Sequence, residues 1–265
     1  MHINVKSKLE VIDLSHQMEN GMPNFASAPE YRFIPNYRLG DFELADGYWG
    51  CNESVTMSGH SGTHIDALGH VAQSGKVYGG MSAADAQSGV QGLIEHSIDD
   101  VAPIFKRGVL IDVATHLGVE VMTAGMPIGV ELIEECLASA GVEIQRDDCV
   151  LVRTGWDLHW GQPETYLGVG SGLPGITVDA LTWLADRGAH LVGSDTGVVE
   201  VTKPGMEELP VHMEALVQRG VYLLENAALT GLVGKATEFL FVASPLRLRG
   251  SSGSPVRPMA VLPGD

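Results

Sequence analysis

The feature of this sequence that most constrains its fold is a unit that occurs three times, an apolar-faced helix followed by a glycine and a short apolar strand. The predicted helices span 128–140, 178–186 and 211–218, and the strands that follow them span 149–152, 190–193 and 221–224. Gly141, Gly188 and Gly220 stand where such helices commonly end, since glycine accepts left-handed backbone. Helices that alternate with strands in this way predict an α/β layered core.

Other stretches add to this picture. Short apolar or alternating runs predict further strands at 9–14, 51–58, 109–114 and 238–242. The apolar spacing of 94–105 is compatible with a helix or a short strand, and 75–89 is predicted to be irregular. A chain of 265 residues, 45% of them hydrophobic, is long enough to bury one sizeable core. We therefore expect one domain over 1–265.

The stretch from about residue 25 to residue 50 does not follow the pattern. It is rich in aromatic residues, contains Pro29 and Pro35, and shows little periodicity. A loop of this length inside a domain is usually functional or disordered, and the aromatic content argues against disorder. The sequence therefore predicts a long excursion without regular structure that covers a pocket or a subunit contact.

Charge and cysteine content exclude several classes of protein. The formal net charge of −17 makes nucleic-acid binding unfavourable. The three cysteines cannot all pair within the chain and form no Cys-x-x-Cys site, which favours a reducing compartment. The N-terminus lacks a signal-peptide core, and no apolar run approaches the roughly 18 to 20 residues that span a bilayer. We expect a cytoplasmic protein without a membrane partner.

Residues 60–70, His-Ser-Gly-Thr-His-Ile-Asp-Ala-Leu-Gly-His, hold three imidazoles and one carboxylate at the end of a predicted strand. His60 and His64 have the spacing of a zinc-binding helix, but position 61 is not Glu and Gly62 weakens a helix. His64 and Asp66 instead point to the same side of an extended segment, while His60 approaches through the turn at Gly62. This pattern predicts a metal site.

Two other motifs lead to weaker hypotheses. Residues 170–175 satisfy Gly-x-Gly-x-x-Gly before a helix, but the preceding strand and the later acidic residue of a dinucleotide site are missing, so a plain loop is favoured. A serine nucleophile at Ser61 is excluded, because Thr63 stands where the nucleophile elbow needs its second glycine.

Two residues far from the cluster are ambiguous on their own. Glu225 closes an apolar strand, where an unpaired carboxylate is unfavourable to bury, and a salt bridge explains it as well as a metal does. His212, taken alone, is interpreted as an ordinary histidine on a helix surface.

The histidine cluster resembles a known signature. Residues 60–70 match the pattern His-x-Gly-Thr-His-x-Asp-x-x-x-His of the cyclase-like metal-dependent hydrolases, the family of bacterial kynurenine formamidase and isatin hydrolase. Further segments resemble the same family: 12–15, 107–113, 151–156, 174–176, 193–196, 244–248 and 254–257. The chain is identified as a member, which implies a cyclase-like, swivelling β/α fold with a mixed central β-sheet or barrel-like core flanked by helices.

The resemblance also implies the site. The implied metal ligands are His60, His64, Asp66, His212 and Glu225, the last two completing a centre of one or two divalent ions. His70 is left for proton transfer. Such ligands suit Zn²⁺ and Mn²⁺ alike and do not select the ion.

The chain departs from the family pattern at one place. The signature commonly has proline after Asp-Ala, whereas Leu68 and Gly69 follow Ala67 here. The turn that carries His70 is therefore expected to differ in rigidity or pocket shape, which bears on the substrate more than on the metal.

The implied activity is hydrolysis of an amide-type C–N bond by metal-activated water, with His70 as general acid and base. Phe25 and Trp49, in the aromatic excursion, are candidates for stacking on an aromatic or cyclic substrate. We favour an isatin-like lactam over an aryl formamide such as N-formylkynurenine. A metal-dependent cyclase or lyase and a non-catalytic metal-binding protein remain alternatives. The family also implies a homodimer or a larger homo-oligomer.

Overall fold

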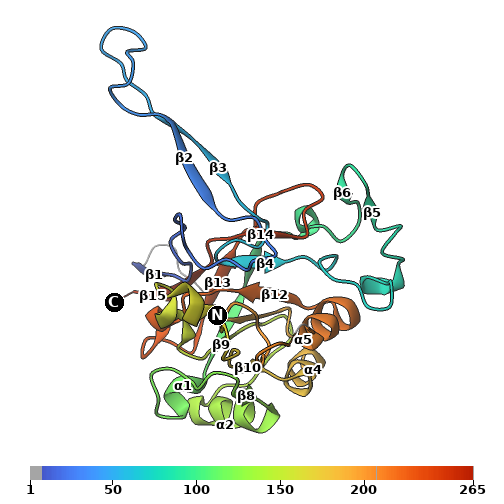
Figure 1. Ribbon diagram of the computed structural model, residues 1–265. Coiled ribbons are helices and arrows are strands. Elements are labelled where there is room, and N and C mark those ends of the chain that lie inside the picture. The colour runs from blue at the N-terminus through green and yellow to red at the C-terminus, as the bar shows by residue number, and fades with distance from the viewer. Residues whose placement is uncertain (1–7, 207, 265) are drawn as a thin grey trace.

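The computed structural model describes residues 8–206 and 208–264 and is built around a nine-stranded sheet (Figure 1). Its strand order is β1-β15-β13-β7-β9-β11-β12-β4-β14. The strands are β1 (Leu9–Asp13), β4 (His64–Asp66), β7 (Ile104–Asp112), β9 (Cys149–Arg153), β11 (Leu191–Ser194), β12 (Tyr222–Glu225), β13 (Glu238–Ala243), β14 (Gly253–Pro255) and β15 (Met259–Pro263). β7, β9, β11 and β12 run parallel, and the outer strands pair antiparallel. The expected mixed sheet is confirmed.

Helices cover one face of this sheet. They are α1 (Val113–His116), α2 (Val130–Ala140), α4 (Val178–Asp186) and the short α5 (Pro210–His212), which continues as a π-helical segment, η4 (Met213–Arg219). Val150 and Val152 of β9 pack in the core under the helices, while Cys149 and Leu151 face the other way. There they meet Phe239, Phe241 and other residues of the outer strands, because the sheet curls round on itself into a half-barrel. The expected α/β class is therefore confirmed, with helices on one face of the sheet and the curled outer strands on the other.

The helix–glycine–strand units are confirmed at α2 and α4, with a difference at the third helix. Gly141 and Gly220 both adopt left-handed backbone after their helices, as expected. The third helix, predicted over 211–218, is a single α-turn at Pro210–His212 followed by wider π-helical turns.

The prediction of no regular structure from 25 to 50 is wrong for part of that stretch. β2 (Arg32–Tyr37) pairs antiparallel with β3 (Asn52–Thr56), and the hairpin projects away from the sheet (Figure 1). The register shifts between Pro35 and Tyr37, where proline interrupts the alternation that would have indicated a strand.

The remaining elements are short. They are η1 (Tyr78–Gly80), β5 (Gln87–Ser88), β6 (Gly92–Leu93), η2 (Ile98–Asp100), β8 (Pro127–Ile128), η3 (Trp156–His159), α3 (Pro163–Tyr166), β10 (Gly175–Ile176) and η5 (Thr230–Leu232). The helix alternative for 94–105 is wrong beyond the single 3₁₀ turn of η2, and residues 104–105 already belong to β7. Within the described ranges, no helix combines the length and the apolar character needed to cross a membrane.

Candidate metal centre

Three adjacent strands bring the first group of side chains together. β4 lies between β12 and β14, and the register sets His64 opposite Glu225 and Asp66 opposite Leu223. His64 and Asp66 are two residues apart and therefore lie on one face of β4. Directly opposed residues of an antiparallel pair also share a face, which places Glu225 beside His64. The register alone makes a cluster of one imidazole and two carboxylates.

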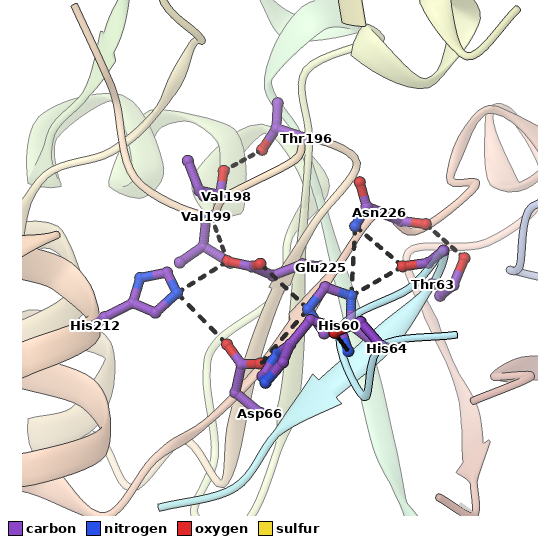
Figure 2. Close-up of polar contacts among 12 residues, drawn as sticks. His60, Thr63, His64, Asp66, Thr196, Val198, Val199, His212, Glu225 and Asn226 are labelled. Atoms are coloured by element: carbon purple, nitrogen blue, oxygen red, sulfur yellow. Dashed lines mark hydrogen bonds and ion pairs between the residues drawn. The ribbon is translucent and has the colours of Figure 1, made fainter. Parts of the chain in front are cut away.

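Two further histidines reach this cluster from outside the strands (Figure 2). His60 comes from the turn before β4, with its Nδ1 2.7 Å from an oxygen of Asp66 and its Nε2 2.9 Å from Oγ of Ser252. His212 comes from α5, with its Nε2 3.4 Å from Asp66 and 3.2 Å from Glu225. Segments that are distant in sequence thus converge on one carboxylate.

The second nitrogen of His64 fixes the direction of the ring. Nδ1 of His64 lies 2.8 Å from the carbonyl oxygen of Gly62, to which it donates, so Nε2 faces Asp66 at 3.5 Å and Glu225 at 3.4 Å. Asn226 donates its amide to the same carbonyl at 3.0 Å. A backbone acceptor on the far nitrogen is the usual way to orient a metal-binding imidazole.

Asp66 provides the test of whether a cation fits. It is fully buried, and neither of its carboxylate oxygens has a hydrogen-bond donor in acceptable geometry within 8–206 and 208–264. A buried carboxylate without such partners is costly unless a cation compensates it. Here candidate ligand atoms lie within 4.8 Å of one another in three overlapping groups, drawn from His60, His64, Asp66, His70, Glu200, His212 and Glu225. These nitrogen and oxygen donors fit a divalent ion such as Zn²⁺ or Mn²⁺.

The charges in the cluster are strongly coupled. Burial by itself would raise the pKa of Asp66, but the four surrounding imidazoles hold it well below its usual range. Burial likewise opposes the charged form of His64, yet the adjacent carboxylates of Asp66 and Glu225 raise its pKa to about 10. The lowered pKa leaves Asp66 anionic, as a metal ligand must be, whereas His64 holds a proton that it would release on binding an ion.

His70 lies at the edge of the cluster. Its ring centre is 4.1 Å from that of His60 and 6.1 Å from that of His212. Burial lowers the pKa of His70 by more than the charge of Asp66 raises it. His70 is therefore neutral at neutral pH and able to accept a proton.

The unusual turn before His70 has a local reason. Leu68 is buried in the core under the helices, and the amide of Gly69 donates to the carbonyl of His96 at 2.9 Å. A Cβ on Gly69 would lie 2.8 Å from Leu93 and 2.9 Å from that carbonyl. This turn therefore depends on Gly69, which donates its amide and has no side chain, and not on a proline.

The two aromatic candidates lie in different places. The ring of Phe25 lies against Gly197, in the loop after β11 whose Val199 amide donates to Glu225 at 3.2 Å. Trp49 is exposed on the projecting hairpin and is not brought to the cluster of its own chain. Phe25 is thus one loop removed from the cluster, and Trp49 lies away from it.

Sequence reasoning missed Glu200, Asn226 and Ser252. Glu200 is 1% exposed and contacts His212. The sequence could have indicated Glu200 in the same way as Glu225, because its carboxylate directly follows an apolar run, here Val198 and Val199. Ser252 lies in a Gly/Ser-rich loop that carries no comparable signal.

Comparison with known proteins gives one family and several relatives. The family described as putative cyclase matches residues 12–201. Isatin hydrolase of Roseibium aggregatum is 26% identical over 274 residues, covering 98% of this chain and 94% of that protein. Kynurenine formamidase of Bacillus cereus is 27% identical over 203 residues, covering 77% and 76%.

A solved structure described as a novel cyclase superposes with a TM-score of 0.85 at 24% identity. The superposition covers 95% of this chain and 88% of that one. At this identity the likeness establishes the fold, and it agrees with the curled mixed sheet described above.

Proposed function

Because the chain belongs to the putative cyclase family, we propose that it is a metal-dependent hydrolase that cleaves an amide-type C–N bond in a small substrate. The observation that carries this proposal is the fully buried carboxylate of Asp66, which lacks a hydrogen-bond donor among the described residues and is surrounded by imidazoles. The names of the relatives, isatin hydrolase and kynurenine formamidase, support the reaction class.

Five residues of the chain would bind the metal. His60, His64 and Asp66 would hold a divalent ion, and His212 and Glu225 would complete a centre of one or two ions. A bound Zn²⁺ or Mn²⁺ supplies Lewis acidity and lowers the pKa of a coordinated water. The neighbouring carboxylates keep the negative charge that such an ion requires.

His70 would move the protons. It lies in the second of the three ligand groups, close to Asp66 and His212, yet it is neutral because of its burial. A neutral imidazole accepts a proton from the attacking water and can return it to the leaving nitrogen. Since His60, His64 and Asp66 form a group without it, His70 is free for this role.

For the substrate we propose an aromatic or cyclic amide, with a lactam of the isatin type favoured over an aryl formamide. Phe25 supports this proposal, because it is 39% exposed and its ring lies against Gly197, in the loop whose Val199 amide donates to Glu225. Trp49 can reach a substrate only if another copy of the chain supplies it.

We also propose a homo-oligomer and a cytoplasmic location. The exposed apolar side chains of the β2–β3 hairpin support the first, since patches of this kind mark interfaces. The free state of Cys51, Cys136 and Cys149 supports a reducing compartment.

The test separates binding from chemistry. Metal content and turnover of lactams, formamides and esters are measured for the wild type, Asp66→Ala and His70→Ala. Asp66→Ala should lose the metal and the activity, whereas His70→Ala should keep the metal and lose at least about 100-fold in turnover. His116→Ala is the matched control, because His116 is exposed and pairs with Glu135.

Product analysis in oxygen-18 water identifies the reaction, because hydrolysis places the label in the new carboxylate. A metal-replete wild type that turned over substrate without incorporating the label would indicate a cyclase or lyase. Full metal and full activity in Asp66→Ala would disprove the scheme.

A further inference from the structure

Glu200 lies behind the centre and takes no part in the function proposed above. One of its carboxylate oxygens accepts from the backbone amides of Val211 at 3.1 Å and His212 at 3.4 Å. Its other oxygen lies 2.5 Å from Nδ1 of the His212 ring. Both oxygens of a side chain that is 1% exposed are therefore engaged by the segment that carries His212.

These contacts determine what the other side of the His212 ring does. With Nδ1 donating to Glu200, the other ring nitrogen, Nε2, faces Asp66 at 3.4 Å and Glu225 at 3.2 Å and is the atom that would bind an ion. The two backbone contacts also fix the start of α5, so the position of Cα and the rotation of the ring depend on the same carboxylate. A carboxylate on the far nitrogen of a ligating histidine selects its tautomer and increases its basicity.

The glycine-containing loop at 170–175 packs against the backbone on either side of Glu200. A Cβ on Gly172 would lie 2.3 Å from the carbonyl of Thr202, and one on Gly175 would lie 2.3 Å from the carbonyl carbon of Glu200. Ile176 then bridges to Glu200, with backbone bonds to Val199 at 3.1 Å and from Val201 at 3.2 Å. The glycines let this loop lie directly against the backbone that presents Glu200.

We propose that Glu200 is a positioning residue of the metal centre, seated by the 170–175 loop, and that it orients His212 without itself binding the ion. The proposal rests on the proposed function, because it requires a metal at His212. It also gives a structural role to the glycine pattern at 170–175, since this loop supports the backbone behind a metal ligand.

The experiment measures metal affinity, independently of catalysis. Purified wild type, Glu200→Gln and Glu200→Asp are stripped of metal and titrated with Zn²⁺ and Mn²⁺ against a chelator of known affinity. Glu200→Gln should bind about 10- to 100-fold more weakly, the effect expected when such an outer partner is lost. Glu200→Asp keeps the carboxylate and should recover part of that loss. Both variants should reach the wild-type number of ions at saturation.

Glu214→Gln is the matched control. Glu214 is two residues beyond His212, and its carboxylate binds Thr182 at 3.2 Å and Arg219 at 2.7 Å. The metal affinity of Glu214→Gln should stay within about twofold of the wild type, since no contact of His212 is changed. Circular dichroism and an unfolding transition for each variant confirm that the compared proteins are folded, and Glu200→Asp tests the proposal if Glu200→Gln does not fold.

The outcomes are distinguishable. Unchanged affinity in the folded Glu200 variants overturns the positioning role while leaving the proposed function intact. Saturation of Glu200→Gln with one ion fewer than the wild type also overturns it, because Glu200 would then be a ligand. A wild-type protein that binds neither metal overturns the proposed function itself.

Discussion

Asp66 is the residue whose burial as an anion is most unfavourable in the metal-free centre. Its carboxylate is completely buried and is oriented by β4, while the groups nearest to it are imidazole nitrogens between 2.7 and 3.5 Å away. A divalent ion would compensate this buried charge only in the folded chain, where the ligands lie together, so metal binding should be coupled to folding.

That coupling gives a prediction about metal removal. Wild-type protein at a metal concentration about 100 times the dissociation constant should gain about 2.7 kcal/mol in the free energy of unfolding over stripped protein. Asp66→Ala should gain almost nothing, because the central ligand is gone. Denaturant unfolding with and without the ion measures both. Equal metal-induced gains in the two proteins would contradict the assignment of Asp66.

His16 gives a prediction about pH. Its ring stacks on Trp160 with centres 4.0 Å apart, and Nε2 is buried without a hydrogen-bond partner in the described chain. Burial lowers the pKa of His16 to about 4, against 6.5 for a free histidine. Below pH 6.5 the unfolded chain therefore binds a proton that the folded chain rejects, and stability falls as the pH drops from 6.5 towards 4.

His16→Phe should remove this dependence while keeping the stacking on Trp160. The wild type should lose about 3 kcal/mol more than the variant in the free energy of unfolding between pH 7 and pH 4. Urea denaturation at a series of pH values measures the difference, and the other titrating groups cancel in the comparison. Parallel pH curves for the two proteins would show that His16 is not the cause.

At the scale of elements, β4 and β14 form the part of the sheet that shapes the site. Gly253 of β14 pairs with Asp66, and a Cβ there would lie 2.6 Å from the ring of His60. Glycine at this position lets the imidazole lie flat against the strand. The edge strand thus contributes space to the centre, while His60, β4 and β12 contribute side chains.

Gly253→Ala should therefore disturb the centre more than the fold. Its backbone is outside the left-handed region, so the cost arises from the contact with His60, at about 1 to 3 kcal/mol in stability. Metal affinity should fall at least about 10-fold as His60 is pushed away from Asp66. Chelator competition measures this, with Gly129→Ala as a control, because a Cβ there has no contact closer than 3.6 Å.

The same elements show what sequence patterns can predict. The strands β7, β9, β11, β12 and β13 were predicted from apolar runs, because each is buried on both faces or alternates regularly. β4 was predicted only as an extended segment that carries His64 and Asp66. β14 was not predicted, since it has three residues and owes its extended form to pairing with a neighbour. The local cluster at 60–70 was evident, but the position of Glu200 behind His212 depends on tertiary packing that no local pattern encodes.

At the scale of the molecule, the β2–β3 hairpin is the feature that a single chain does not explain. It projects from the sheet, and its exposed apolar side chains are Phe33, Ile34, Leu39, Phe42, Leu44, Tyr48, Trp49 and Val55. An isolated two-stranded hairpin is marginally stable in water. A second copy of the chain that covers it would stabilise it and complete the proposed homo-oligomer.

Charge on this hairpin should therefore break the assembly. The double variant Phe42→Glu and Trp49→Glu should elute as a monomer in size-exclusion chromatography with light scattering, whereas the wild type should not. Val90→Glu is the control, because Val90 is 97% exposed and lies outside the hairpin. A double variant that keeps the wild-type mass would exclude the hairpin from the interface, and a monomeric wild type would exclude the assembly.

The pairing of β4 with β12 also has a consequence for biosynthesis. Residues 64–66 and 222–225 form adjacent strands, so the first half of the centre is synthesised long before its partners leave the ribosome. Contacts between such distant segments form late in folding, because a long loop must close first. A nascent chain that ends before β12 lacks Glu225 and the strand that pairs with β4, so His64 and Asp66 are not yet aligned with their partners. Metal loading should therefore follow completion of the chain, and truncated products should remain metal-free.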